Sequence, residues 1–161
     1  MGDGGGRVGR KTIRRAAGTV TFLDLLRSPG RLLDRATGRG GARAEADVAA
    51  LRAGEGREMS AFVRDGRRLR PGSLVLDPGA RSPVVWRPYR FPGRRGRAVA
   101  LTGPLRVRGE GPADGPGSPA VDRRAFRLLT VEAADRSWEL AVPAVDVPLV
   151  RAALRLPRTG A

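Results

Sequence analysis

The residues that could do chemistry in this chain are few in kind. The 161 residues include no cysteine and no histidine, which excludes thiolate nucleophiles, cysteine-ligated metal centres and the usual general base at neutral pH. The only lysine is Lys11, in the N-terminal tail. Glu132 and Glu139 flank the last predicted hairpin and could face one another, but strand carboxylates more often pair with arginine, here Arg127 or Arg136. We therefore expect no enzymatic activity, no cofactor, no metal and no small-molecule substrate.

Arginine is the residue type that remains for a functional site. All but one of the 31 basic residues are arginine, and the formal net charge is +15, which favours an anionic partner. A GC-rich genome accounts for part of this excess but not for its distribution. Residues 59–108 hold 12 arginines against two acidic residues, whereas 109–161 hold seven of each. The candidate anion-binding residues flank two predicted turns: Arg64, Arg67, Arg68, Arg70, Arg90, Arg94, Arg95 and Arg97.

Alternation of apolar and polar residues predicts β structure over most of the chain after residue 59. Seven strands are predicted, at 60–64, 69–76, 83–89, 97–101, 104–108, 126–133 and 137–143. Asp65-Gly66 is a strong hairpin signal between the first two strands. The loop at 109–119 has no folding signal and is expected to be mobile. Asp146 caps a predicted helix that runs to Leu156, with an apolar face.

The N-terminal part is predicted to differ from the strand-rich part. Residues 1–18 are glycine- and arginine-rich and are expected to be a disordered basic tail. Residues 37–58 are expected to be a linker with a solvent-exposed helix at 42–53, ended by Gly54. Residues 19–36 are expected to form a short basic amphipathic helix that either contacts a membrane or partner or packs on the domain. Its contact residues would be Phe22, Leu25, Leu26, Arg27, Arg31, Leu33 and Arg35.

Seven short strands followed by one amphipathic helix resemble the pleckstrin-homology-like (PH-like) superfold. The segments that carry the resemblance are SAFVRDG, GSLVL, VVWRP, FRLLTVEA, SWELAVP and DVPLVRAAL. The resemblance covers 59–157, the predicted domain, and implies a mainly β fold: a bent, seven-stranded antiparallel sandwich or barrel capped by a C-terminal α-helix. The layout is also similar to an uncharacterised actinobacterial family that carries such a domain behind one membrane helix. No run in this chain approaches 18 apolar residues.

The resemblance also implies a mode of binding. In phosphoinositide-binding members, two adjacent loops clamp phosphates with a basic residue that ends the first strand and a basic-X-basic pair that opens the second. Arg64, followed by Arg68-Leu69-Arg70, resembles this pattern, and the planar guanidinium suits bidentate phosphate contacts. We expect a cytoplasmic, non-enzymatic domain that presents these arginines to anionic headgroups at the inner face of a membrane or to an acidic partner protein.

Two other functions remain open. The same arginines could bind nucleic acid, with Trp86, Tyr89 and Phe91 as candidate stacking platforms, although Trp86 lies on the apolar side of its strand and is expected in the core. Alternatively, the domain is a protein–protein interaction module and the arginines only keep it soluble. Trp138, Phe126 and Leu128 are expected in the core.

Overall fold

The computed structural model describes residues 14–15, 40–90, 94–113 and 125–155. The amphipathic helix predicted at 19–36 lies outside the described residues, with all its proposed contact residues. Phe91, most of the predicted tail and most of the loop predicted at 109–119 also lie outside them.

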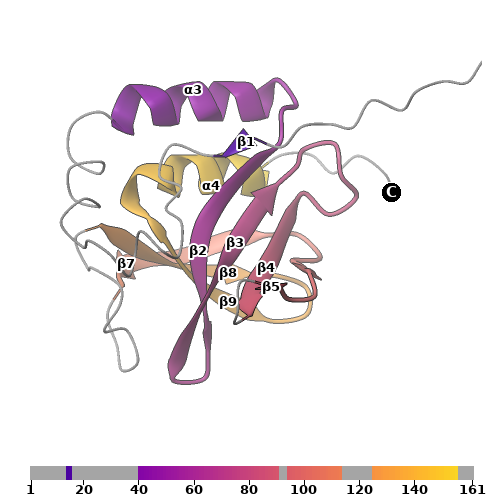
Figure 1. Cartoon of the computed structure of the whole chain (residues 1–161), viewed down its shortest axis with the longest axis vertical. Coiled ribbons are helices and arrows are strands. Elements are labelled where there is room, and N and C mark those ends of the chain that lie inside the picture. The colour runs from indigo at the N-terminus through magenta and orange to yellow at the C-terminus, as the bar shows by residue number, and fades with distance from the viewer. Residues whose placement is uncertain (1–13, 16–39, 91–93, 114–124, 156–161) are drawn as a thin grey trace, which may run out of the picture.

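The described chain is mainly β and ends in a helix, as predicted (Figure 1). Its strands are β1 (Arg14–Arg15), β2 (Arg57–Asp65), β3 (Arg68–Leu76), β4 (Val84–Arg90), β5 (Arg94–Arg95), β6 (Val99–Ala100), β7 (Arg106–Pro112), β8 (Phe126–Glu132) and β9 (Ser137–Pro143). Its helices are α3 (Gly40–Arg52), the short 3-10 helix η1 (Ala144–Asp146) and α4 (Val147–Arg155). Seven strands pair in the order β5-β4-β3-β2-β9-β8-β7, all antiparallel, while β6 pairs with β4 and β1 pairs with β2 in parallel.

The hairpin predicted at Asp65-Gly66 is formed by β2 and β3. Their register extends from Arg57↔Leu76 to Asp65↔Arg68, and Gly66 has a φ of +60°, a conformation that glycine adopts with little strain. The end of this hairpin projects beyond the rest of the sheet (Figure 1). The turn therefore carries its side chains away from neighbouring strands.

Strands β5, β6 and β7 differ from the predicted strands in their bounds. The strand predicted at 97–101 is reduced to the two residues of β6. A second short strand, β5, lies before the predicted range, and β4 pairs with β5 and β6 in turn. β7 continues to Pro112, so the first four residues of the loop predicted at 109–119 belong to a strand. β8 and β9 match their predicted positions.

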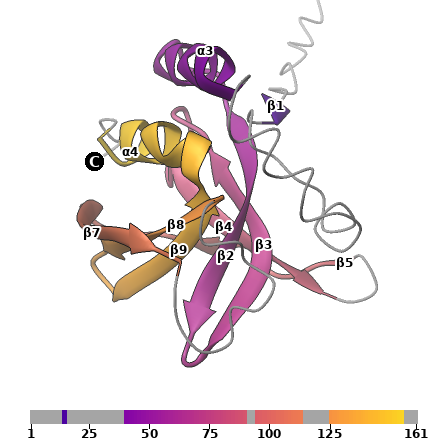
Figure 2. The same cartoon turned by 90° about the vertical axis from the view of Figure 1, so that its left-hand side faces the viewer.

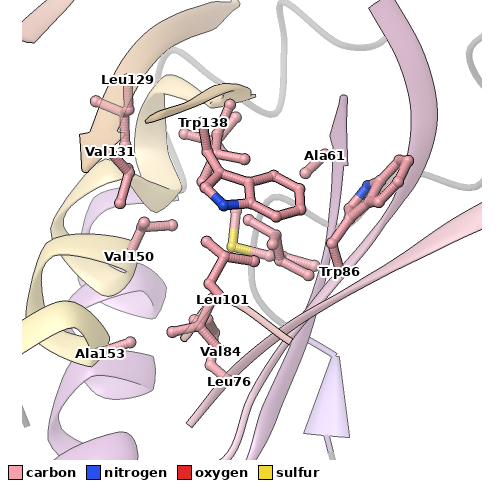
Figure 3. Close-up of a cluster of buried hydrophobic side chains, with 14 of the residues drawn as sticks. Ala61, Leu76, Val84, Trp86, Leu101, Leu129, Val131, Trp138, Val150 and Ala153 are labelled. Carbon is pink, nitrogen blue, oxygen red and sulfur yellow. The ribbon is translucent and has the colours of Figure 1, made fainter. Parts of the chain in front are cut away.

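The main core lies between the bent sheet and α4. In Figure 2 the strands β2–β4 and β7–β9 diverge as two wings, with α4 over the angle between them. Figure 3 shows Trp138 in the middle of this cluster, with Val150 of α4 on one side and Trp86 of β4 on the other. Trp138 is 2% exposed and Trp86 is 7% exposed, so both belong to the core as predicted.

A smaller apolar cluster lies on the opposite face of the sheet. It is built around Phe62 of β2 and Phe126 of β8, whose rings meet edge to face with centroids 5.6 Å apart. Phe126 is fully buried and Leu128 is partly buried. This second cluster explains why strand β2 is buried on both faces.

Helix α3 is packed onto the domain, whereas the sequence analysis expected an exposed helix within a linker. Leu51 is fully buried and Ala44 nearly so, and α3 lies beside α4 in both views (Figures 1 and 2). Small alanine side chains allow two helices to approach closely, so a strong amphipathic pattern is not needed. α3 therefore belongs to the same packed unit as the strands.

Strand β1 adds a short segment that the prediction of a disordered tail at 1–18 left out. Arg14 and Arg15 pair in parallel with Arg57 and Glu58 of β2. Because β9 pairs only with Phe62 and Val63 on that side of β2, the first half of β2 leaves backbone groups for β1.

Candidate anion-binding surface

The tip of the β2–β3 hairpin carries two arginines without a counter-charge. Arg67 lies in the turn and Arg68 opens β3, and both are exposed. Neither forms an ion pair within the described part of the chain. The nearby Asp65 carboxylate accepts instead from Arg70, with a separation of 2.8 Å between Nη2 and Oδ2. The tip therefore presents two adjacent guanidinium groups to solvent.

Arg64, the first residue of the predicted phosphate clamp, is held by an acidic partner on the sheet. Its Nε lies 3.0 Å from Oε2 of Glu139 on β9, and the Arg64 side chain is only 19% exposed. The contact is possible because β9 lies next to β2, with Phe62 opposite Ala141. A phosphate at Arg64 would have to compete with this carboxylate.

The second predicted turn is divided between paired, unpaired and undescribed side chains. Arg95 of β5 lies 3.2 Å from Glu58 of β2, measured from Nη2 to Oε1. Arg97 is exposed and has no ion pair among the residues that the structure describes. Arg90 and Arg94 are opposite one another in the β4–β5 ladder, and their side chains lie outside the described part of the structure.

The β2–β3 tip and β5 point in different directions. In Figure 2 the end of the β2–β3 hairpin points away from the sheet, whereas β5 extends to the side. Within the predicted set, Arg64, Arg70 and Arg95 have acidic partners, while Arg67, Arg68 and Arg97 have none among the described residues. The geometry thus favours the hairpin tip over a two-loop clamp.

The two carboxylates considered for catalysis are parts of separate ion pairs. In the β8–β9 ladder Glu132 is opposite Ser137 and Glu139 is opposite Thr130, so the two glutamates do not face each other directly. Glu132 binds Arg108, and Glu139 binds Arg64.

The predicted partners of these glutamates were wrong. Arg127 makes no ion pair in the described chain. Arg136 lies 3.8 Å from Asp135 and stacks over the ring of Trp138. Among the described residues, no group of acidic side chains is arranged to hold a metal ion.

Two of the three candidate stacking residues, Trp86 and Tyr89, are described, and neither is exposed. Trp86 is buried in the core and Tyr89 is half-buried. A stacking platform must expose its ring face, so neither of these two residues is placed to stack on a base.

A second basic surface lies between α3 and α4, and the sequence analysis did not identify it. Its residues are Val48, Arg52, Pro148, Arg151, Ala152 and Arg155. The sequence carried a signal for the α4 side of this surface. Counted from Pro148, the residues Arg151, Ala152 and Arg155 follow at three, four and seven positions, and this spacing places them on one face of a helix. The packing of one helix beside the other was not predicted, and so the groove was missed.

The chain has no match among protein-family models, curated proteins or solved structures. Neither of the described α-helices is long and apolar enough to cross a bilayer.

Proposed function

We propose that this chain is a non-enzymatic, PH-like binding domain that attaches to anionic membrane headgroups through the tip of the β2–β3 hairpin. The PH-like assignment is supported by the order of elements: seven antiparallel strands, a first hairpin at the centre of the sheet, and a helix directly after the last strand that covers the core. The order of strands along the sheet, with the first long strand beside the last one, supports the same assignment.

The choice of anionic headgroups as the ligand rests on one observation. Arg67 and Arg68 are exposed, adjacent and without an acidic partner in the described chain, on a hairpin that projects from the sheet (Figure 1). A projecting tip can reach a flat surface without the rest of the domain coming close. Guanidinium groups bind phosphate oxygens in a bidentate manner, and a bilayer presents many phosphates at one height. Arg97 adds a third unpaired charge nearer the β4–β6 end of the sheet.

The test is co-sedimentation of the full chain with vesicles of phosphatidylcholine alone and of phosphatidylcholine with phosphatidylglycerol in equal parts. The test variant is R67Q/R68Q/R97Q. Each arginine near an anionic surface contributes about 1 kcal/mol, so loss of the two tip arginines alone should weaken binding to the anionic vesicles roughly 30-fold. Loss of Arg97, which is farther from the tip, should add less. Binding of the wild type should also weaken as salt is raised.

The matched control is R81Q/R106Q/R127Q, which removes the same charge from three exposed arginines that have no ion pair in the described structure. This control should retain most of the binding. Equal losses in the two variants would mean that net charge alone drives attachment. A wild-type protein that stays in the supernatant with both vesicle types would contradict the proposal.

A further inference from the structure

A groove of about 440 Å³ lies between α3 and α4. On α4 it is lined by one helical face, which includes Pro148, Arg151 and Arg155, while the buried residues of α4 lie on the other face. On α3 it is lined by Val48 and Arg52, one turn apart. The groove therefore combines an apolar floor with arginines at its edge.

The structure itself shows that a carboxylate is bound at this edge. Nη2 of Arg151 donates a hydrogen bond of 2.8 Å to Oε2 of Glu110, on β7. The other two arginines, Arg52 and Arg155, are exposed and have no ion pair among the described residues. One of three guanidinium groups is thus neutralised, and two are available for acidic groups of another molecule.

The position of the two unpaired arginines has a simpler partial explanation. Arg52 lies in the last turn of α3 and Arg155 in the last turn of α4, where a cation interacts favourably with the helix dipole. That effect accounts for a basic residue at each helix end. It does not account for Val48, Pro148 and Ala152 between them, which are only partly buried or exposed.

The shape of the groove selects among anionic partners. Attachment to a bilayer favours bulky apolar side chains that protrude from the protein surface. Here the apolar residues are small and lie between two helices, where the side chains of a partner can reach them. An amphipathic helix places apolar residues on one face with charged residues beside them, and it binds in grooves of this kind. The unpaired charges of Arg52 and Arg155 favour acidic residues beside its apolar face.

From this arrangement we infer that the α3–α4 groove is a docking site for an acidic amphipathic helix of a partner protein. Apolar side chains of the partner contact Val48, Pro148 and Ala152, and its carboxylates pair with Arg52 and Arg155. α4 is nine residues long, so the contact covers about two to three helical turns. This site is separate from the hairpin tip, and the protein can use both at once.

The probe is a fluorescein-labelled peptide of about 18 residues, long enough to form helix in water, with leucines along one face and glutamates on either side of them. Fluorescence anisotropy measures its binding to the full-length protein. R52Q/R155Q should weaken binding roughly tenfold, as expected for the loss of two charge-assisted contacts. The matched control R81Q/R127Q removes the same charge elsewhere and should change binding by less than about twofold.

A charge reversal makes the test specific. R52E/R155E should lose the glutamate peptide and gain binding of a peptide in which every glutamate is replaced by lysine. The absence of saturable binding by the wild type, equal losses in R52Q/R155Q and R81Q/R127Q, or failure of the lysine peptide to bind R52E/R155E would each overturn the proposal.

Two further arms separate this site from the proposed membrane contact. R67Q/R68Q/R97Q should bind the glutamate peptide as the wild type does, whatever its behaviour with vesicles. If R52Q/R155Q instead reduces binding to anionic vesicles as strongly as R67Q/R68Q/R97Q does, the groove contacts the membrane and the inference of an acidic helix is wrong.

Discussion

A buried guanidinium at Arg57 joins α3 to the first long strand, and its removal is the most informative perturbation of the fold. Arg57 is 5% exposed. Its Nε donates to Oδ1 of Asp47 on α3 at 2.9 Å, and both terminal nitrogens donate to Oε2 of Glu55 at 3.1 Å. Nη1 also donates to the carbonyl oxygen of Gly56 at 3.0 Å. The side chain therefore satisfies acceptors on α3 and on the loop between α3 and β2 at once.

We expect Arg57→Met to lower the free energy of unfolding by about 3–5 kcal/mol, the usual cost of removing one partner of a buried ion pair. Most of this cost comes from Asp47, which is 9% exposed and loses a charged partner in a region with little water. Glu55 contributes little because its side chain is 52% exposed, and Glu55→Gln should cost less than about 1 kcal/mol. For a domain stabilised by about 5–15 kcal/mol, the loss at Arg57 is a large fraction.

Urea unfolding followed by tryptophan fluorescence measures the effect, because Trp86 and Trp138 are both buried. Hydrogen exchange shows where the loss occurs: amides of α3 should lose protection before those of β2 and β3, since α3 is held by fewer contacts. In a double-mutant cycle, Asp47→Asn and Arg57→Met should couple by about 1–3 kcal/mol. Additive effects, or an Arg57→Met variant within about 1 kcal/mol of the wild type, would refute the reasoning.

Two smaller predictions concern single residues and use the same unfolding assay. Gly103→Ala should destabilise by about 2–4 kcal/mol, because φ is +81° there and an added Cβ would clash with Ala134. Gly111→Ala is the matched control, because an added Cβ there meets nothing within 4 Å. This control should be neutral or slightly stabilising. Arg136→Ala should cost about 0.5–1 kcal/mol, because its guanidinium carbon stacks 3.7 Å from the centroid of the Trp138 ring. An Arg136→Ala variant as stable as the wild type would show that this stacking contributes nothing.

The elements that could be predicted are those specified by neighbouring residues. Asp65-Gly66 fixes a tight turn, and alternating apolar residues on both sides of it specify β2 and β3 in register. The same local signals located β8, β9 and α4. The short strand β5 could not be predicted, because it depends on the end of β4 leaving the sheet and pairing with Arg94 and Arg95.

The position of α3 shows where local signals stop being sufficient. Its sequence is mostly alanine and polar residues, with Leu51 as its only leucine, so no strong apolar face indicates what the helix packs against. Two interactions locate it: the burial of Leu51 and the ion pair of Asp47 with Arg57. The ion pair joins residues ten positions apart on different elements, and nothing in either local pattern predicts it.

The candidate site was predicted because arginines outnumber acidic residues in 59–108 but not in 109–161. In the folded chain, acidic residues of the second segment lie next to arginines of the first. The sheet places β9 beside β2, and β8 beside β7. Carboxylates from 109–161 therefore neutralise arginines from 59–108, as Glu139 does for Arg64 and Glu132 for Arg108.

An arginine stays unpaired when no strand that carries a carboxylate lies close enough for its side chain to contact. The tip of a projecting hairpin meets this condition, since the turn has no strand beside it and Asp65 is already bound to Arg70. Arg67 and Arg68 thus remain unpaired because of where the fold places them. A basic site in a protein this rich in arginine is better predicted from the distance of each arginine to the strands that carry acidic residues than from the number of arginines in a segment.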